Sequence, residues 1–398
     1  MHLIQSSRWA MIAIALVLVA AAAITIPARR ASADDPQRFS FALWGDVPYA
    51  KANNAADIPV MISDMNASGL AFTVFDGDTK DGSSRCDNSS YDDAKARFNS
   101  TTAPTVYVVG DNEWTDCHRS NNGDFNALER LDYLRKTMFN TVASFGKATM
   151  PLEHQGPVGG KYAENTRWIY GNVAFIGINM IGSNNNFVLD AKGCDDGGRT
   201  KRTLNDCLAD NIEAAERDAA NISWLRDTFA IAKQRKLAGV MIIAQADLSF
   251  DVPETPTIDE RSDPNFNGLN AFFNAMADET MKFNGQVVYV HGDTHFFKVD
   301  KPLAIDPAVK PGANKFVVGD NAKAVANFTR VQTFGSANAA WVKVTVDPTS
   351  RNVFVFEPMI PGSPAPTATG PVPTATPAGA TATPAASGTA TATATPKP

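Results

Sequence analysis

The sequence predicts an α/β protein built of layers, in which strands alternate with helices and the later strands add a second, more antiparallel sheet. Apolar, β-like runs recur along the chain, and helical apolar patterns lie between several of them. Towards the end of the globular region, Ala340–Val346 and Val353–Phe356 have the pattern of a closing hairpin. The chain has no internal repeat, so we expect one layered fold.

Strands and helices are recognised here by the different periods of their apolar residues. The strand-like runs lie at 39–45, 71–75, 105–109, 172–178, 239–244 and 286–291. Apolar faces of helical spacing predict helices between them. These faces are Ile58, Met61, Ile62 and Met65; Ile222, Leu225, Phe229 and Ala232; and Leu269, Phe272, Phe273 and Met276. The segment Ile181–Thr203 is rich in Asn, Gly and Asp, so we expect a long surface loop there.

Residues 1–33 have the pattern of a secretory signal peptide. A short polar start with His2 and Arg8 precedes the apolar run Trp9–Ile26, and Ala31-Ser32-Ala33 offers a small-residue cleavage site. An uncleaved transmembrane anchor is the alternative, because the apolar run is close to the roughly 20 residues that a bilayer requires. Either interpretation predicts a secreted or extracytoplasmic protein, or one anchored at the cell envelope.

The other end of the chain has a different composition. Residues 361–398 are almost entirely Pro, Thr, Ala, Gly and Ser, with Lys397 as the one charge. We expect a disordered tail, either a spacer at the cell envelope or a flexible end without a partner. Residues 34–360 are long enough for one large domain. The net charge of −6 indicates no nucleic-acid partner, since nucleic acid prefers a basic face.

The four cysteines predict disulfides if the protein is exported. Three pairings are possible for four cysteines. Cys194 and Cys207 share one polar segment, which makes a local bridge plausible. Cys86 and Cys117 each follow a Gly-Asp turn, so a second bridge is expected if those turns share one sheet edge. A zinc cluster is disfavoured, because the chain has no Cys-x-x-Cys pair.

Strand-like runs end in Gly-Asp at four places along the chain. The carboxylates are those of Asp46, Asp78, Asp111 and Asp293. Ligands bind at the carboxyl ends of strands in open α/β sheets, so carboxylates gathered there indicate a metal site. The second turn, Asp76–Gly82, begins like a calcium loop, but its fifth position is Lys80 and its twelfth is Asp87 instead of Glu. A calcium loop is therefore the weaker interpretation.

The turns, in order, read Gly-Asp at 45–46, Gly-Asp-x-x-Asp at 77–81, Gly-Asp-Asn-Glu at 110–113 and Gly-Asp-x-His at 292–295. This series resembles the ordered motifs of the calcineurin-like metallophosphoesterases, the superfamily that includes the purple acid phosphatases. The resemblance covers roughly residues 39–300, and Ile222–Asp247 resembles the segment before the superfamily's lone His. It implies a four-layer α/β/β/α sandwich of two mixed sheets flanked by helices.

The resemblance also implies a set of metal ligands. Asp46 matches the first-metal aspartate, and Asp78 matches the carboxylate that bridges two metals. Asp111 stands in place of the Asn that ligates the second metal. Asp293 and His295 stand where Gly-His-x-His has its histidines. The remaining predicted ligand, at the lone His position, is Gln245.

The sequence departs from the family pattern at two histidines. Pro48 replaces the His of Asp-x-His, and Asn112 replaces the catalytic His. A site this rich in oxygen favours Mn²⁺ or Mg²⁺, in one or two copies, although Zn²⁺, Fe and Ca²⁺ stay open. His118 is the candidate for a displaced catalytic acid, with a plain loop histidine as the alternative.

Charged residues beside the turns have two interpretations each. Asp81 and Glu113 are expected either to orient the ligands or to cap a helix. Lys80, Arg85 and Arg119 are either contacts for phosphate or solvated surface charges.

The function that these motifs predict is hydrolysis of a small phosphate mono- or diester outside the cytoplasm. A metal-activated water held by the Asp-rich loops would attack phosphorus. The replaced histidines and the tail support an alternative, a non-catalytic, metal-stabilised binding or cell-surface domain on the same scaffold.

Overall fold

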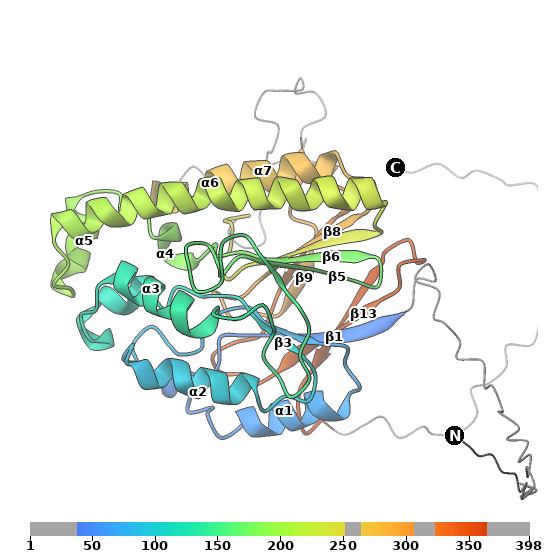
Figure 1. Ribbon diagram of the computed structural model, residues 1–398, viewed down its shortest axis with the longest axis horizontal. Coiled ribbons are helices and arrows are strands. Elements are labelled where there is room, and N and C mark those ends of the chain that lie inside the picture. The colour runs from blue at the N-terminus through green and yellow to red at the C-terminus, as the bar shows by residue number, and fades with distance from the viewer. Residues whose placement is uncertain (1–37, 251–263, 306–322, 364–398) are drawn as a thin grey trace, which may run out of the picture. The chain divides into compact units, whose positions relative to one another are not determined.

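The computed structural model describes residues 38–250, 264–305 and 323–363 (Figure 1). Two large mixed sheets pack face to face, and helices cover their outer faces, which confirms the predicted α/β/β/α sandwich. The predicted signal segment, 1–33, and nearly all of the predicted tail, 361–398, lie outside the described residues.

The first sheet has five strands. In spatial order they are β14 (Phe354–Met359), β13 (Trp341–Val346), β1 (Phe39–Trp44), β2 (Thr73–Phe75) and β3 (Thr105–Tyr107). Strands β1, β2 and β3 run parallel, whereas β13 runs antiparallel to both β1 and β14. The carboxyl ends of β1 to β3 therefore meet at one edge, and β13 and β14 form the predicted closing hairpin.

The second sheet has seven strands. In spatial order they are β4 (Glu153–His154), β5 (Thr166–Tyr170), β6 (Val173–Gly177), β7 (Gly239–Ile243), β8 (Gln286–His291), β12 (Phe328–Gln332) and β9 (Lys298–Asp300). Strands β6, β7, β8 and β12 run parallel, so their carboxyl ends also share one edge. A separate two-stranded ribbon pairs β10 (Ala304–Ile305) with β11 (Lys323–Ala324).

Helices form the outer layers of the sandwich. The five-stranded sheet is covered by α1 (Ile58–Ala67), α2 (Asn88–Phe98) and α3 (Ala127–Met138). The seven-stranded sheet is covered by α6 (Leu204–Arg235) and α7 (Asn270–Met281). Short helices fill the connections, namely η1 (Ala50–Ala52), η2 (Thr115–His118), η3 (Ser120–Asn122), α4 (Gly182–Asn185), α5 (Ala191–Asp195), η4 (Asp196–Gly198) and η6 (Pro264–Leu269).

Successive side chains of β1 point to opposite faces of the sheet, so this strand contributes both to the core between the sheets and to the core under the helices. Phe41 points between the sheets, where its ring meets that of Phe175 on β6 edge-on at a centroid distance of 5.4 Å. Trp44 points to the opposite face and packs with Phe98 of α2. This period of two explains why β1 reads as a continuous apolar run, since both of its faces are buried.

The structure corrects the prediction of a long surface loop at Ile181–Thr203. This segment contains α4, α5 and η4, and Ile181 and Asn185 are buried in it. The next helix, α6, is much longer than its predicted apolar face. It begins at a capping box, in which Thr203 accepts from the backbone N–H of Asp206 and the Asp206 side chain accepts in return.

Both expected disulfides are present. Cys86 pairs with Cys117, and Cys194 pairs with Cys207. Two disulfides fit an extracytoplasmic protein, because the cytosol keeps thiols reduced. No helix in the described part of the chain is both long and apolar enough to span a membrane.

Candidate metal centre

The predicted site residues converge where the parallel strands of both sheets end. Asp46, Asp78 and Asp111 follow β1, β2 and β3 of the five-stranded sheet. Gln245 follows β7 of the seven-stranded sheet, and Asp293 and His295 follow β8. These turns thus lie together at the carboxyl ends of the strands, where a Gly-Asp turn after a parallel strand is expected to lie.

Three of these residues form a compact group of possible metal ligands. One ligand atom from each of Asp46, Asp78 and His295 lies within 4.8 Å of the others. His295 Nε2 is 3.1 Å from Asp46 Oδ1. The other oxygen of Asp46, Oδ2, is buried and has no hydrogen-bond partner. A buried carboxylate oxygen without a partner is costly unless a cation binds it, so this Asp-Asp-His group could hold a metal ion.

Tyr49 is a site residue that the sequence analysis missed. Its hydroxyl donates to Asp78 Oδ2 at 2.8 Å and lies 3.2 Å from His295 Nε2. The side-chain amide of Asn112 donates to the same Asp78 oxygen at 2.7 Å. Asn112 thus orients Asp78, while Tyr49 joins two of the possible ligands. Its position three residues after the first Gly-Asp turn was the one signal in the sequence.

The side-chain amide of Gln245 lies among the carboxylates of the centre and donates hydrogen bonds to them. Its Nε2 is 3.2 Å from Asp111 Oδ1, 3.1 Å from Asp293 Oδ1 and 3.4 Å from Asp78 Oδ2. Its Oε1 accepts the backbone N–H of Gly182 at 2.6 Å. Turning the amide over would set Nε2 against that N–H, so Gly182 fixes the orientation. This geometry does not support the predicted ligand role of Gln245, because its oxygen faces away from the carboxylates.

Burial of so many carboxylates together opposes their ionisation. Burial, with the charges of Asp111 and Asp46, raises the pKa of Asp78 well above its ordinary value. Burial and the same two neighbours raise the pKa of Asp293. Burial also raises the pKa of Asp46, against the opposing effect of His295. These carboxylates therefore lack enough counter-charge within the protein, and a bound cation would supply it.

The backbone at the centre is tightly shaped. Asp46, Asp78, Asp293 and His295 all have left-handed conformations, with φ of 52°, 60°, 68° and 64°. Such residues cost energy and persist where the surroundings hold them, commonly at functional sites. Gly110 precedes Asp111, and a Cβ there would lie 2.0 Å from Asp78 Oδ1 and 2.4 Å from the Asp78 backbone nitrogen. Only glycine allows the β3 turn to approach Asp78 so closely.

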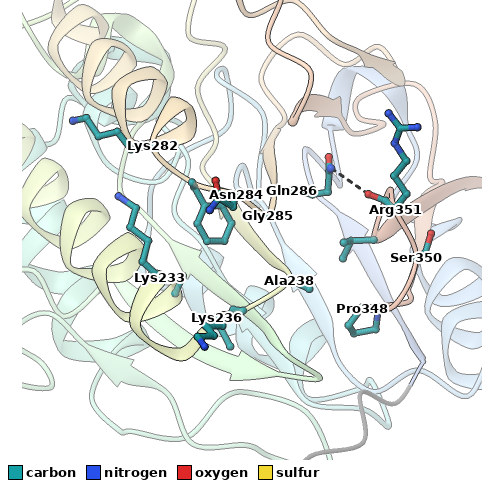
Figure 2. Close-up of a pocket in the computed structure, with 14 residues that line it drawn as sticks. Lys233, Lys236, Ala238, Lys282, Asn284, Gly285, Gln286, Pro348, Ser350 and Arg351 are labelled. Carbon is teal, nitrogen blue, oxygen red and sulfur yellow. Dashed lines mark hydrogen bonds between the residues drawn. The ribbon is translucent and has the colours of Figure 1, made fainter.

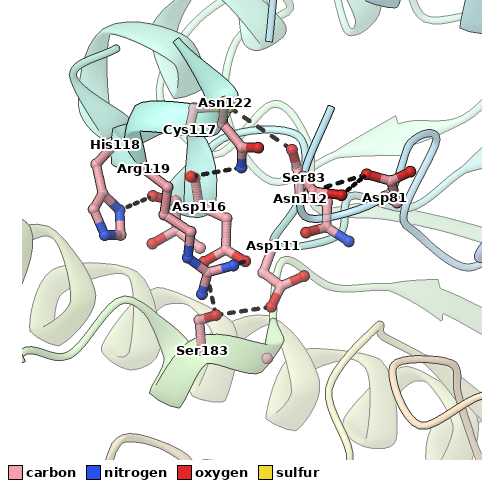
Figure 3. Close-up of polar contacts among 12 residues, drawn as sticks. Asp81, Ser83, Asp111, Asn112, Asp116, Cys117, His118, Arg119, Asn122 and Ser183 are labelled. Carbon is pink, nitrogen blue, oxygen red and sulfur yellow. Dashed lines mark hydrogen bonds and ion pairs between the residues drawn. The ribbon is translucent and has the colours of Figure 1, made fainter. Parts of the chain in front are cut away.

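A polar network links the centre to the loop that follows it (Figure 3). The hydroxyl of Ser183 lies 2.9 Å from Asp111 Oδ2 and 2.8 Å from Asp116 Oδ1. Asp116 also forms an ion pair with Arg119. The Cys86–Cys117 sulfurs lie 3.6 and 3.7 Å from the carbonyl oxygen of Asn112. The disulfide therefore supports the loop that carries Asp111 and Asn112.

His118 does not contact this centre. Its ring points away from Asp111 (Figure 3), and its Nδ1 lies 2.6 Å from the carbonyl oxygen of Thr115. Its side chain lines a separate cavity that also contains Arg202. Burial and the charge of Arg202 lower the pKa of His118 to about 4, so it is neutral near pH 7. This position gives no support to the predicted catalytic acid.

The other predicted carboxylates lie around the centre without reaching the Asp-Asp-His group. Glu113 accepts from the backbone N–H of Thr79 at 2.8 Å, and burial raises its pKa to about 7. Asp81 accepts from the backbone N–H groups of Ala50 and Ser83, each at 2.8 Å. Both side chains brace the turns of the site, and Asp81 accepts from the first residue of the helix η1.

A cavity of about 390 Å³ lies at the opposite edge of the seven-stranded sheet, where β7 and β8 begin (Figure 2). Basic side chains surround it, among them Lys233, Lys236, Lys282 and Arg351. Lys233 and Lys282 both pair with Glu279, near the ends of α6 and α7. None of the predicted site residues lines this cavity, so it is separate from the metal centre.

No protein-family profile and no curated protein matches the sequence. Among solved structures, the chain is similar to GAP50, the anchor in the inner membrane complex of Plasmodium, with 13% identity and a TM-score of 0.39. That similarity covers 81% of this chain and 89% of GAP50.

Proposed function

We propose that this protein is an extracytoplasmic, metal-dependent phosphoesterase of the calcineurin-like metallophosphoesterase superfamily. The observation that supports this most is the buried group Asp46, Asp78 and His295, whose ligand atoms lie within 4.8 Å of one another at the carboxyl ends of β1, β2 and β8. The ordered Gly-Asp motifs also support the proposal, since these residues match the motifs of the superfamily that the sequence resembles.

We expect one Mn²⁺ or Mg²⁺ ion per chain. The two carboxylates, with the Tyr49 hydroxyl beside them, are oxygen donors that suit these ions, and His295 adds one imidazole. A second ion would need the oxygens of Asp78, Asp111 and Asp293, to which the Gln245 amide already donates. Stoichiometric zinc or iron in the purified protein would contradict this assignment.

The proposed reaction is hydrolysis of a phosphate mono- or diester. A bound cation supplies Lewis-acid charge, which acidifies water and stabilises negative charge on the phosphoryl group. The oxygen of water adds to phosphorus as the bond to the ester oxygen breaks, and the ester oxygen leaves as an alcohol after taking up the proton that the water gives up. Tyr49 and Asn112 hold Asp78 in place through hydrogen bonds of 2.8 and 2.7 Å. Because His118 is distant and neutral, we expect activated aryl esters to react faster than alkyl esters.

The test is hydrolysis of p-nitrophenyl phosphate and bis(p-nitrophenyl) phosphate with Mn²⁺, Mg²⁺, Zn²⁺ or Ca²⁺. We expect activity with Mn²⁺ or Mg²⁺ that disappears in Asp78→Asn. The matched control is Asp92→Asn, a change on α2 where the side chain is 70% exposed. Full activity in Asp78→Asn would refute the assigned centre.

The second candidate function is a metal-stabilised binding domain without turnover. It is favoured by one observation, that His295 alone among the described histidines is hydrogen-bonded to a carboxylate of the centre. A melting temperature that rises with metal, together with no hydrolysis of either ester, would support this function over the first.

A further inference from the structure

A second cavity opens beside the metal centre. Its volume is about 710 Å³, which lies in the range of about 300–1,000 Å³ typical of small-molecule sites. Tyr49 lines it, and the hydroxyl of Tyr49 donates to Asp78 Oδ2 at 2.8 Å. The cavity is therefore next to the place where a phosphate ester would react. The basic side chains that line it are Lys51, Arg119 and Arg199.

Arg119 and Arg199 are held as a pair. Arg199 Nη2 lies 2.7 Å from Asp196 Oδ1, and Arg119 Nε lies 3.7 Å from the other oxygen of the same carboxylate. The backbone N–H of Ser120 donates to the carbonyl oxygen of Arg199 at 2.7 Å, which joins the two loops. The Cys194–Cys207 disulfide further restrains the loop of Arg199. The side-chain contacts of the two arginines use Nε and Nη2 of Arg199 and Nη1 and Nε of Arg119, so within the described residues Arg199 Nη1 and Arg119 Nη2 are left to donate to a phosphate.

Gly82 lies between Arg119 and Asn112, which belongs to the metal centre. A Cβ at Gly82 would lie 2.8 Å from Asn112 Oδ1 and 3.4 Å from Arg119 Nη1. Asn112 donates to Asp78, whereas Arg119 lines the cavity. A glycine at this position therefore lets the cavity lining and the metal centre pack closely together.

The cavity is lined by three basic side chains and one acidic side chain, so an anion would bind near the basic ones. Asp81 is the acidic residue of the lining, and it already accepts from the backbone N–H groups of Ala50 and Ser83. Lys51 has no ion-pair partner within residues 38–250, 264–305 and 323–363, and the side chain of Arg199 is 70% exposed. Arg119 is shared with Asp116 and is 27% exposed. Lys51 thus stays free of an ion pair in the described part of the chain, while Arg199 reaches solvent and keeps N–H groups that its contact with Asp196 does not use.

We propose that Arg119 and Arg199 bind a second phosphate group of the substrate, so that the preferred substrate is a small bisphosphate. This proposal rests on the proposed phosphoesterase function. The ester phosphate reacts at the metal centre, while the second phosphate stays bound in the cavity. Arg199 is then a specificity-determining residue that does not touch the reacting atoms.

The first experiment compares release of phosphate from glucose 1,6-bisphosphate and glucose 6-phosphate, with p-nitrophenyl phosphate as the reference. We expect a lower KM for the bisphosphate. Arg199→Ala should raise that KM about tenfold, the effect of losing one charge-assisted contact, and leave the KM for p-nitrophenyl phosphate unchanged. Arg351→Ala, at the other cavity, is the matched control and should change neither value.

The second experiment does not depend on activity. Phenylglyoxal modifies exposed arginines, and mass spectrometry measures how far each ligand protects Arg199 in the full-length protein. We expect glucose 1,6-bisphosphate to protect Arg199 more than glucose 6-phosphate does, with Arg351 unprotected. Hydrolysis of p-nitrophenyl phosphate with no preference for the bisphosphate and no protection would overturn this inference alone. No hydrolysis of any ester would instead remove the proposed function, and protection would then decide whether the arginine pair binds phosphate.

Discussion

Glu113 provides the sharpest test of the electrostatics around the centre. Its side chain is 1% exposed, and its Oε1 accepts from Thr79 N–H at 2.8 Å and lies 3.2 Å from the Tyr107 hydroxyl. Its Oε2 is buried without a partner. Burial raises the pKa of Glu113 from 4.5 to about 7, so above pH 7 the folded protein holds a charge that the unfolded chain carries more easily.

The magnitude follows from this change in proton affinity. Each tenfold change in proton affinity corresponds to about 1.4 kcal/mol. Raising the pKa from 4.5 to about 7 therefore means that ionised Glu113 lowers the free energy of unfolding by about 3 kcal/mol. Because the pKa of Glu113 is higher in the folded protein than in the unfolded chain, protonated Glu113 contributes its full stabilisation below pH 4.5. This contribution to the free energy of unfolding is lost as the pH rises to about 7.

The perturbation is Glu113→Gln, which retains the oxygen acceptor and cannot ionise. We expect the free energy of unfolding of the variant, relative to wild type, to rise by about 3 kcal/mol between pH 4.5 and pH 8. Urea denaturation with a chelator present measures both proteins at each pH, and the difference cancels the other titrating groups. Asp92→Asn, an exposed acid, should show no such trend. A difference that is constant with pH, or that falls as the pH rises, would refute the reasoning.

Two further predictions concern contacts around the site. Tyr49→Phe removes the hydroxyl that donates to Asp78 Oδ2, so we expect calorimetric titration to show Mn²⁺ binding weakened by roughly tenfold; unchanged affinity would contradict the contact. Replacing both cysteines of Cys86–Cys117 by Ser should cost about 4 kcal/mol in urea denaturation, against about 3 kcal/mol for Cys194–Cys207, because the loops close over 31 and 13 residues. The opposite order would count against this entropic explanation.

Much of the fold was predictable because its signals are local. The apolar runs gave β1, β2, β3, β6, β7 and β8 at nearly their observed bounds, and the Gly-Asp turns placed Asp46, Asp78, Asp111 and Asp293 at strand ends. Strands β5 and β12 were missed because their sequences, TRWIY and FTRVQ, place arginines within short apolar runs. Those arginines are buried by partners distant in sequence, Arg167 with Glu153 and Arg330 with Asp300.

The sequence by itself determined the layered α/β class, the edge at which the carboxylates gather and the pairing expected of the cysteines. Only the tertiary structure decided which atoms meet at that edge. In the folded protein the Tyr49 hydroxyl donates to Asp78, and the backbone N–H of Gly182 fixes the orientation of the Gln245 amide. His118 lies away from the centre, and the loop of Arg199 is hydrogen-bonded to the loop of Arg119. The physical reason is that periodicity and turn residues act over a few neighbouring positions. The direction of a buried polar side chain instead depends on hydrogen bonds from segments far along the chain.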